Sequence, residues 1–525
     1  MSFISMEFLL FLAGAILGYY LIPKRFQWVW LLMCSCVFYL CAGLQAVCFL
    51  LTTAMTTFAA GLWIKQREDA VKKRLALLPA GAPKEDKKAL KERCRRQKCL
   101  IVAGTLLVNF GILGALKYMN FAIDNLNALL GLDLSRVSLL LPLGISFYTF
   151  QSMGYLIDVY RGKYEPERNP FRFALFVSFF PQLLQGPIGR FDRLSTQLYE
   201  EHRFDLTSLQ RGLLLMVWGY FKKIVIADRA AVLVNQVFGN YEAYTGFAVI
   251  AAVLGYSVQL YCDFSGGMDV VMGASECFGI HLDQNFKRPY FARSISDFWH
   301  RWHITLGTWM KDYLFYPLSL SKAMNRFGKF TKKHFGRHVG RVLPVCISNL
   351  VIFFVVGVWH GAAWKFIVYG LYNGIIIALS NLLAPLYTKL LQALHIPVKS
   401  RAWTVFQILR TFVLVNISWY FDMGSSLSAA FAMMRNTFRG LSPAALTDGS
   451  LLSLGLGKAD FLVLGAGCAV LFTVSLLQER NVKIRESLAK KPLIVRLSLY
   501  LLLLFSIPLL GQITITGGGF IYAQF

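Results

Sequence analysis

Two stretches of the sequence gather polar and ionisable side chains among apolar ones, and both contain histidine. The first, DFWHRWHITLGTWMKDYLFYPL, covers residues 297–318, and the second, GVWHGAAW, covers residues 357–364. The ordinary pKa of histidine is about 6.5, so a neutral imidazole can accept a proton near physiological pH. General base catalysis is therefore the chemistry that these stretches suggest.

His360 has the more informative position. It follows an apolar run of about 18 residues that begins near Val342, and an upright helix of that length rises about 27 Å. We therefore predict that His360 lies deep in a bilayer or near its outer half. Gly357 and Gly361 flank it, so that another backbone or a substrate can come close. The alternative is an interfacial histidine beside Trp359.

His300 and His303 are three residues apart, and on a helix they would share a face. A metal site would need a third ligand of matching character, and the neighbouring sequence offers none, so we expect no metal. Asp297 could instead orient one of these histidines by a hydrogen bond. The alternative is an amphipathic interfacial helix. Its three tryptophans would be Trp299, Trp302 and Trp309.

The composition is that of a membrane protein. Of 525 residues, 56% are hydrophobic and 16% are charged, whereas soluble domains have about 45–50% apolar and about 25% charged residues. A spanning helix needs about 20 mostly apolar residues, and such runs recur along the chain. We predict an all-α, polytopic integral membrane protein, with about 10–13 transmembrane or re-entrant helices around a central catalytic tunnel.

Glycine and proline interrupt several of these apolar runs. The run over 26–64 has Gly43 at its middle, which predicts two helices joined by a tight turn. Residues 183–190 and 263–267 interrupt two further runs, and we expect both to be breaks in re-entrant segments. Non-helical backbone at membrane depth is tolerated only beside protein or a water-filled cavity.

The net charge of +26 is concentrated between the apolar runs. Residues 65–98 carry 13 Lys or Arg against 5 acids, and residues 321–341 carry 7 with no acid. The positive-inside rule predicts that both are cytoplasmic loops, together with 478–496, and that the N-terminus lies outside. This distribution indicates topology and lipid contact, so we expect no nucleic-acid partner.

We expect a single membrane domain over residues 1–525. Within it, residues 1–64 form an N-terminal three-span unit, and 65–98 form the basic cytoplasmic loop. Residues 140–385 form the catalytic core, and 386–525 form the C-terminal helices.

Five stretches resemble the membrane-bound O-acyltransferase family, in particular its branch that O-acetylates bacterial exopolysaccharides such as alginate. They are FFPQLLQGPIGR (179–190), the stretch 256–280 around CDFSGG, the stretch 285–318 around FWHRWHIT, GVWHGAAW (357–364) and GGGFIYAQF (517–525). Together they span most of the chain after about residue 140.

This resemblance implies that His360 is the catalytic residue and that His303 is a second residue important for function. Trp302, Trp359 and Arg301 are candidates to line the tunnel or to support an oxyanion. The resemblance implies no bound cofactor. The donor substrate is then acetyl-CoA or an acyl carrier thioester, and the acceptor is a hydroxyl outside the cytoplasm.

The expected partners are the lipid bilayer, an extracytoplasmic acetyl-acceptor protein and the polysaccharide synthesis and export machinery. The expected location is the bacterial plasma membrane. D-alanyl transfer to teichoic acid remains an alternative within the same chemistry. A proton-coupled transporter or flippase using His303 and His360, and a non-catalytic scaffold of an export complex, remain alternatives of other classes.

Overall fold

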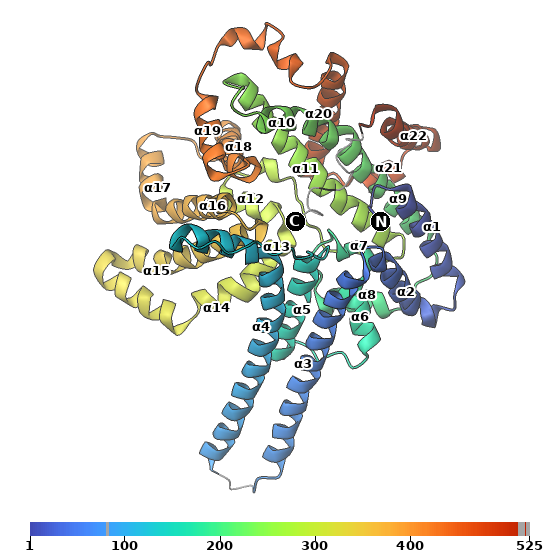
Figure 1. The fold of residues 1–525 in the computed structure, drawn as a ribbon, viewed down its shortest axis with the longest axis vertical. Helices are drawn as coiled ribbons and strands as arrows, with labels where there is room; N and C mark the ends of the chain where they lie inside the picture. The colour runs from blue at the N-terminus through green and yellow to red at the C-terminus, as the bar shows by residue number, and fades with distance from the viewer. Residues whose placement is uncertain (80–82, 513–519, 521–525) are drawn as a thin grey trace. The chain divides into compact units, whose positions relative to one another are not determined.

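The computed structural model describes residues 1–79, 83–512 and 520 (Figure 1). These residues form α-helices joined by short 3₁₀ and π-helical turns, and no strand occurs among them. The all-α prediction is confirmed. Of the terminal motif 517–525, all but Phe520 lies outside the described residues.

The chain divides into two compact units. Unit 1 comprises residues 1–213 and 271–283, and unit 2 comprises residues 214–270 and 284–525. Helices α9 (Leu206–Tyr220) and α11 (Phe247–Glu276) each contribute residues to both units. Two of the three points at which the chain passes from one unit to the other therefore fall within helices, and the third falls between Asp283 and Gln284.

The remaining helices of unit 1 occupy its first 199 residues. They are α1 (Met6–Leu21), η1 (Lys24–Phe26), α2 (Gln27–Leu40), α3 (Leu44–Ala76), α4 (Lys84–Leu130), α5 (Ile145–Tyr160), α6 (Pro170–Ser178), α7 (Phe180–Leu183) and α8 (Phe191–Tyr199).

Unit 2 holds the remaining helices. Before residue 320 they are the π-helix η2 (Phe221–Ala227), α10 (Asp228–Gly239), η3 (Pro289–Phe291), α12 (Ile295–Arg301), α13 (Ile304–Met310), the π-helix η4 (Lys311–Phe315) and α14 (Tyr316–Ser319). After it they are α15 (Lys322–His360), α16 (Trp364–Leu382), α17 (Ala384–Ala393), α18 (Arg401–Met423), α19 (Leu427–Thr437), η5 (Pro443–Leu446), η6 (Ser450–Ser453), α20 (Lys458–Glu479), α21 (Ile484–Ala489) and α22 (Leu493–Leu510).

Eight of the described helices are long and apolar enough to cross a membrane: α3, α4, α11, α15, α16, α18, α20 and α22. Helix α1 is apolar but shorter. Other apolar runs of the sequence fold as short helices, because proline, glycine and polar residues interrupt them. The chain is thus a multi-pass membrane protein that combines long spans with short helices.

The break predicted at Gly43 is confirmed. Gly43 has a φ of +104°, a backbone conformation that favours glycine, and α2 and α3 lie on either side of it. The break predicted at 183–190 is also confirmed, since α7 ends at Leu183 and α8 begins only at Phe191.

The break predicted at residues 263–267 is wrong, because α11 runs through these residues without interruption. Its glycines serve close packing instead. A Cβ on Gly266 would lie 2.8 Å from the carbonyl oxygen of Gly219 on α9, and a Cβ on Gly219 would lie 2.5 Å from that of Gly266. The two helix backbones therefore touch at these residues.

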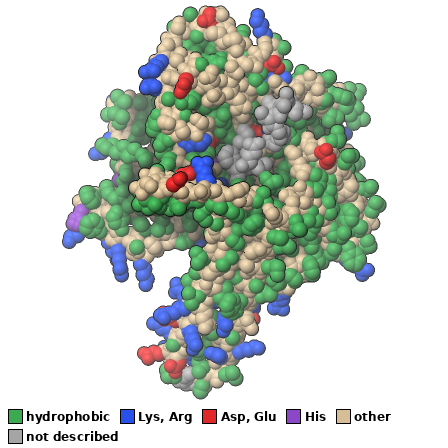
Figure 2. Space-filling model, viewed as in Figure 1, with side chains coloured by type: hydrophobic (Ala, Val, Ile, Leu, Met, Phe, Trp, Pro, Cys, Tyr) green, Lys and Arg blue, Asp and Glu red, His purple; other side chains and the backbone are tan. Residues whose placement is uncertain are grey.

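The basic segments predicted as loops are largely helical. Residues 65–76 continue α3 and residues 84–98 begin α4, and these two helices form a long hairpin in unit 1 (Figure 1). Residues 322–341 belong to α15, which is kinked at Gly336 with a φ of +85°. Lys and Arg favour helix at least as well as loop, so a charge run does not by itself end a helix. Figure 2 shows Lys and Arg side chains, with a few acidic ones, gathered at the free end of the α3–α4 hairpin.

The contact between Gly219 and Gly266 predicts opposite effects of one substitution at two sites. Gly219→Ala should lower the free energy of unfolding by about 1–3 kcal/mol, because the new methyl group must push α11 away. Gly111→Ala, on α4 with nothing within 4 Å of an added Cβ, should raise it by up to about 1 kcal/mol. Unfolding of the two variants in detergent micelles, compared with the unaltered protein, measures both. Equal effects would contradict the close packing.

Candidate active site

The position of His360 is set by a tight hairpin between α15 and α16. A Cβ on Gly357 would lie 2.4 Å from the carbonyl oxygen of Phe366, and one on Gly370 would lie 2.1 Å from that of Phe353. Side chains at these two positions would force the helices apart. The approach of another backbone, expected beside His360, is therefore the backbone of α16.

His360 is the last residue of α15 and is only 5% exposed. Its ring meets Tyr369 edge to face, with 5.1 Å between centroids, and lies nearly parallel to Phe366 at 6.4 Å. Trp359 packs against it at 5.1 Å. The imidazole is thus enclosed by aromatic rings.

His303 lies in the turn between α12 and α13, outside the eight long apolar helices. Its backbone is left-handed, with a φ of +49°. Asn285 holds the turn, because its carbonyl accepts a hydrogen bond from the Ile304 N–H and its side-chain Oδ1 accepts from the Thr305 N–H and hydroxyl, at 2.9–3.0 Å. The His303 side chain is 1% exposed.

The expectation that His300 and His303 share a helix face is wrong. Helix α12 ends at Arg301, and Trp302 has an extended backbone. The chain therefore turns between the two histidines. His300 is exposed and its Nδ1 bonds the carbonyl of Ser296 at 2.7 Å, while His303 is directed into the core.

Both buried imidazoles contact the same indole. The ring centroid of Trp359 lies 5.2 Å from that of His303 and 5.1 Å from that of His360, each at a steep angle. The ring of Phe264, on α11, also contacts that of His303, with 5.0 Å between centroids. Of the residues predicted for the site, His303, His360 and Trp359 are therefore brought together.

Burial determines the protonation state of His303. Removal from water, followed by the influence of nearby His360, lowers the pKa of His303 to about 3. Its imidazole is neutral at physiological pH, and a neutral imidazole both donates and accepts a hydrogen bond.

Trp302 lies beside this group, and its ring centroid is 6.4 Å from that of Phe264. It is 1% exposed and packs in an aromatic cluster with Phe286, Phe298 and Trp419, at centroid distances of 5.0–5.7 Å. Its place is that of a core residue supporting α12.

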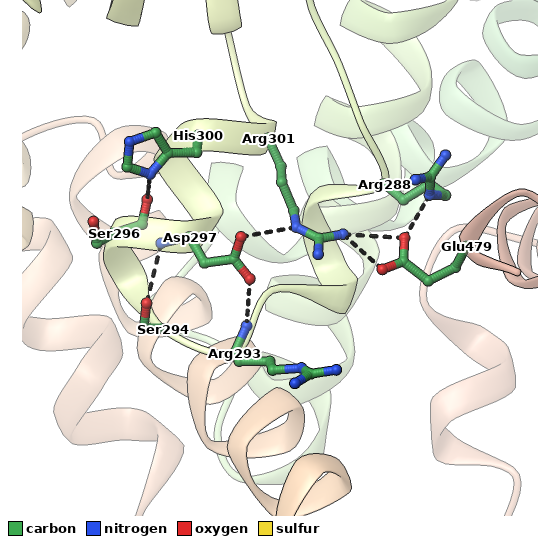
Figure 3. A network of polar contacts seen from close by, with 8 residues as sticks. All are labelled: Arg288, Arg293, Ser294, Ser296, Asp297, His300, Arg301 and Glu479. Atoms are coloured by element: carbon green, nitrogen blue, oxygen red, sulfur yellow. Dashed lines mark hydrogen bonds and ion pairs between the residues drawn. The ribbon is translucent and has the colours of Figure 1, made fainter. Parts of the chain in front are cut away.

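The guanidinium group of Arg301 forms ion pairs with two carboxylates (Figure 3). Its Nε bonds Asp297 at 3.0 Å, and its Nη1 bonds both oxygens of Glu479 at 3.1 Å. Arg288 joins the same Glu479 at 2.6 Å. The network ties α12 to the end of α20. Asp297 therefore pairs with Arg301, and its other oxygen accepts the Arg293 N–H, in place of the bond to a histidine that the sequence suggested.

A buried ion cluster fixes α11 next to His303. Lys223, in the π-helix η2, pairs with Asp228 at 2.8 Å and also with Asp263, the residue before Phe264. The three side chains are between 1% and 8% exposed. The neighbouring Lys222 bonds Ser265 and pairs with Asp269, each at 2.8 Å. These contacts set the rotation of α11, and so the position of Phe264 against His303.

Sequence reasoning missed Tyr369, Asn285 and Lys223. Asn285 begins the stretch 285–318 that resembles the family, and Lys223 is one of five charged residues within residues 210–237. Both therefore carried a signal, because polar and ionisable residues inside a membrane protein are costly. Tyr369 carried none, since only the hairpin geometry brings it to His360.

Comparison with known proteins shows which family the chain belongs to. The profile of the membrane-bound O-acyltransferase family matches residues 167–419, which contain both histidines. The chain is 32% identical to the probable alginate O-acetylase AlgI of Azotobacter vinelandii, over 89% of this chain and 85% of that protein. The chain belongs to the membrane-bound O-acyltransferase family. It is an O-acyltransferase.

Two further relatives have similar coverage. The probable alginate O-acetylase AlgI of Pseudomonas aeruginosa is 33% identical, over 83% of this chain and 75% of that protein. A peptidoglycan O-acetyltransferase of Helicobacter pylori is 29% identical, over 86% of this chain and 81% of that protein. The names of these relatives have O-acetylation in common and differ in the polymer.

The ion cluster predicts a severe effect of removing its lysine. Lys223→Met removes the cation that pairs with the buried Asp228 and Asp263 carboxylates, which should lower the free energy of unfolding by about 3–5 kcal/mol. Lys483→Met, at an exposed pair with Glu486, should cost less than about 1 kcal/mol. Denaturant unfolding in micelles measures both.

A triple variant tests the electrostatic cause. Lys223→Met combined with Asp228→Asn and Asp263→Asn removes the uncompensated charge, and it should recover part of the lost stability. No recovery would mean that the lysine acts by packing alone.

His303 predicts a pH dependence of stability. Its folded-state pKa of about 3 lies below the unfolded value of about 6.5, so its contribution is complete above pH 6.5 and is lost as the pH falls. Between pH 7 and pH 5 the unaltered protein should lose about 2 kcal/mol relative to His303→Gln. Unfolding of both proteins at each pH gives this difference. If the difference in free energy of unfolding between the two proteins is the same at pH 7 and pH 5, folding does not lower the pKa of His303.

Proposed function

We propose that this O-acyltransferase moves an acetyl group from a cytoplasmic thioester, acetyl-CoA or an acyl carrier thioester, to a hydroxyl outside the cytoplasm during O-acetylation of a surface polysaccharide. The observation that carries the proposal is the convergence of two buried imidazoles, His303 and His360, on the indole of Trp359. The relatives support acetyl as the acyl group and a carbohydrate polymer as the acceptor.

In this proposal His360 is the general base. Its imidazole takes the proton of the acceptor hydroxyl, the hydroxyl oxygen attacks the thioester carbonyl, and the C–S bond breaks to release the thiolate. The proton then passes to the thiolate, so that the products are an ester and a thiol. His303, neutral through burial, donates a hydrogen bond to the reacting oxygen.

Trp359 supports the proposal as the residue that holds both rings. An indole has one N–H donor and no strong acceptor, so it can position imidazoles without competing for the proton. The aromatic enclosure also excludes water, which would otherwise hydrolyse the thioester.

The proposal also requires the donor and the acceptor to reach the histidines from opposite sides of the membrane. Basic residues at the ends of α3 and α4 favour a cytoplasmic location for that end by the positive-inside rule. The central tunnel and an extracytoplasmic acetyl-acceptor protein in the plasma membrane assembly remain part of this proposal.

A proton-coupled transporter finds less support. Such a relay needs intramembrane acids next to the histidines. Two acids near the ends of apolar runs could serve, Asp422 and Asp460. Asp422 accepts a hydrogen bond from Tyr256 at 2.7 Å, and Asp460 pairs with Arg229 at 3.1 Å. Both carboxylates are thus engaged with other side chains.

The decisive experiment measures thiol release and acetyl transfer by the purified full-length protein given labelled acetyl-CoA and a polysaccharide acceptor. His360→Ala should lower the rate by about 10²–10⁴-fold, because the general base is lost. His303→Ala should also lower it.

His300→Ala is the matched control, since His300 lies three residues from His303 but is exposed. Its rate should be unchanged. Unaltered acetylation in both the His303 and His360 variants would end the catalytic assignment, and substrate flux without thiol release would favour a transporter.

A further inference from the structure

His303 belongs to a turn made by two chain segments that run side by side, residues 285–288 and 301–304. Two backbone hydrogen bonds join the segments: the Lys287 N–H donates to the Arg301 carbonyl at 2.8 Å, and the Ile304 N–H donates to the Asn285 carbonyl at 3.0 Å. Because these bonds lie on either side of His303, a shift of one segment along the other moves the imidazole.

Each segment contains one residue with a left-handed backbone. Arg288 has a φ of +48°, and His303 has a φ of +49°. Residues other than glycine adopt this conformation rarely, because the Cβ comes close to a backbone oxygen. Such residues persist where the surrounding contacts hold them, and they gather at functional sites. The turn therefore needs contacts that oppose its relaxation.

Glu479, the last residue of α20, joins the two segments through its carboxylate (Figure 3). The Nε of Arg288 donates to one carboxylate oxygen at 2.6 Å, and the Nη1 of Arg301 donates to both oxygens at 3.1 Å. Arg288 is itself one of the two left-handed residues, and Arg301 lies two residues before the other. One carboxylate thus holds both segments of the turn from a helix far along the chain.

Water has limited access to these ion pairs. The side chains of Arg288, Arg301 and Glu479 are 15%, 18% and 30% exposed. Hydrogen bonds between charged groups are stronger and more directional than those between neutral groups, and partial burial reduces their screening by salt. The carboxylate therefore restricts how far the two arginines, and the segments that carry them, can move apart.

We propose that Glu479 is a positioning residue of this acyltransferase. Its carboxylate holds the turn in the conformation that directs the His303 imidazole to Trp359 in the core. The effect on rate rests on the proposed function, in which His303 donates a hydrogen bond to the reacting oxygen. A displacement of about 1 Å can slow a reaction about 10²-fold, so a looser turn lowers kcat and leaves substrate binding intact.

The first test compares Glu479→Gln, which keeps the shape of the side chain and removes its charge, with the unaltered full-length protein. The kcat of acetyl transfer from acetyl-CoA should fall about tenfold, and the KM for acetyl-CoA should change by less than about twofold. Glu486→Gln is the control, because Glu486 forms an exposed ion pair with Lys483 at 3.3 Å, close to the end of α20. It should change neither constant.

A double variant shows whether Glu479 acts through His303. In protein that already carries His303→Gln, adding Glu479→Gln should lower kcat by less than about twofold, because the group that the carboxylate positions is gone. A fall of about tenfold in both backgrounds would overturn the proposal and assign Glu479 to stability of the fold alone.

A second measurement does not depend on catalysis. Diethyl pyrocarbonate acylates neutral imidazoles, and mass spectrometry gives the rate for each histidine. In the unaltered protein His303, which is 1% exposed, should react slowly, and exposed His300 should react fast. Glu479→Gln should raise the rate at His303 at least about threefold, because the turn opens more often. The rate at His360, which the α15–α16 hairpin holds, should stay the same.

The outcomes separate the turn from the chemistry. Faster labelling of His303 and not of His360 supports the proposal even if no acetyl transfer is found. An unchanged labelling rate at His303 in Glu479→Gln overturns it even if the unaltered protein transfers acetyl groups normally. Equal increases at both histidines also overturn it, since they indicate a general loosening of the fold. So does a normal kcat in Glu479→Gln when His303→Gln is slow.

Discussion

The contact between the backbones of α15 and α16 is the constraint on which the histidine site depends. Gly357 and Gly370 allow each helix to meet a carbonyl oxygen of the other, and any larger residue would separate them. Close approach of this kind is how helices associate where apolar surfaces gain little from leaving lipid. Because the helices touch, the ring of Tyr369 reaches His360 at the end of α15.

The site is completed by elements that come from distant parts of unit 2. Asn285 holds the turn at His303 by hydrogen bonds. Helix α11 carries Phe264, which contacts His303, and the ion pair between Asp263 and Lys223 holds this part of the helix in place. Buried ion pairs add little net stability, but breaking one is costly. A cluster of this kind therefore specifies one rotation of α11 more than it strengthens the fold.

The long spans could be predicted because hydropathy and length determine them. The turn at Gly43 could be predicted because an apolar run of twice the spanning length must turn near its middle, and glycine favours a turn there. The breaks were harder to predict. Gly186 and Pro187 interrupt a helix, whereas Gly266 lies within one and packs against Gly219. Glycine permits both outcomes, and only the partner backbone decides between them.

The candidate site, too, could be predicted only in part from the sequence. His303 and His360 were recognisable because each lies in a motif that places histidine among apolar residues and that resembles the family. The contact of both histidines with Trp359 could not be predicted. It depends on the left-handed turn at His303 and on the α15–α16 hairpin at His360, and more than 50 residues separate the two histidines in the sequence. Arg301 drew attention as a charge beside the motif, but its partner Glu479 lies on α20, far along the chain.

The α3–α4 hairpin has a consequence for how its cations act. The twelve residues from Lys65 to Ala76 extend α3 by about 18 Å, and the Debye length in physiological salt is about 8 Å. If α3 stands upright with Ile64 at the edge of the hydrocarbon, the outermost cations are screened from the headgroup plane and sit among mobile counterions. Their influence is then strongest while the nascent chain is inserting, when charges flanking a span decide which way it enters, and weak once the bilayer has closed around the finished protein.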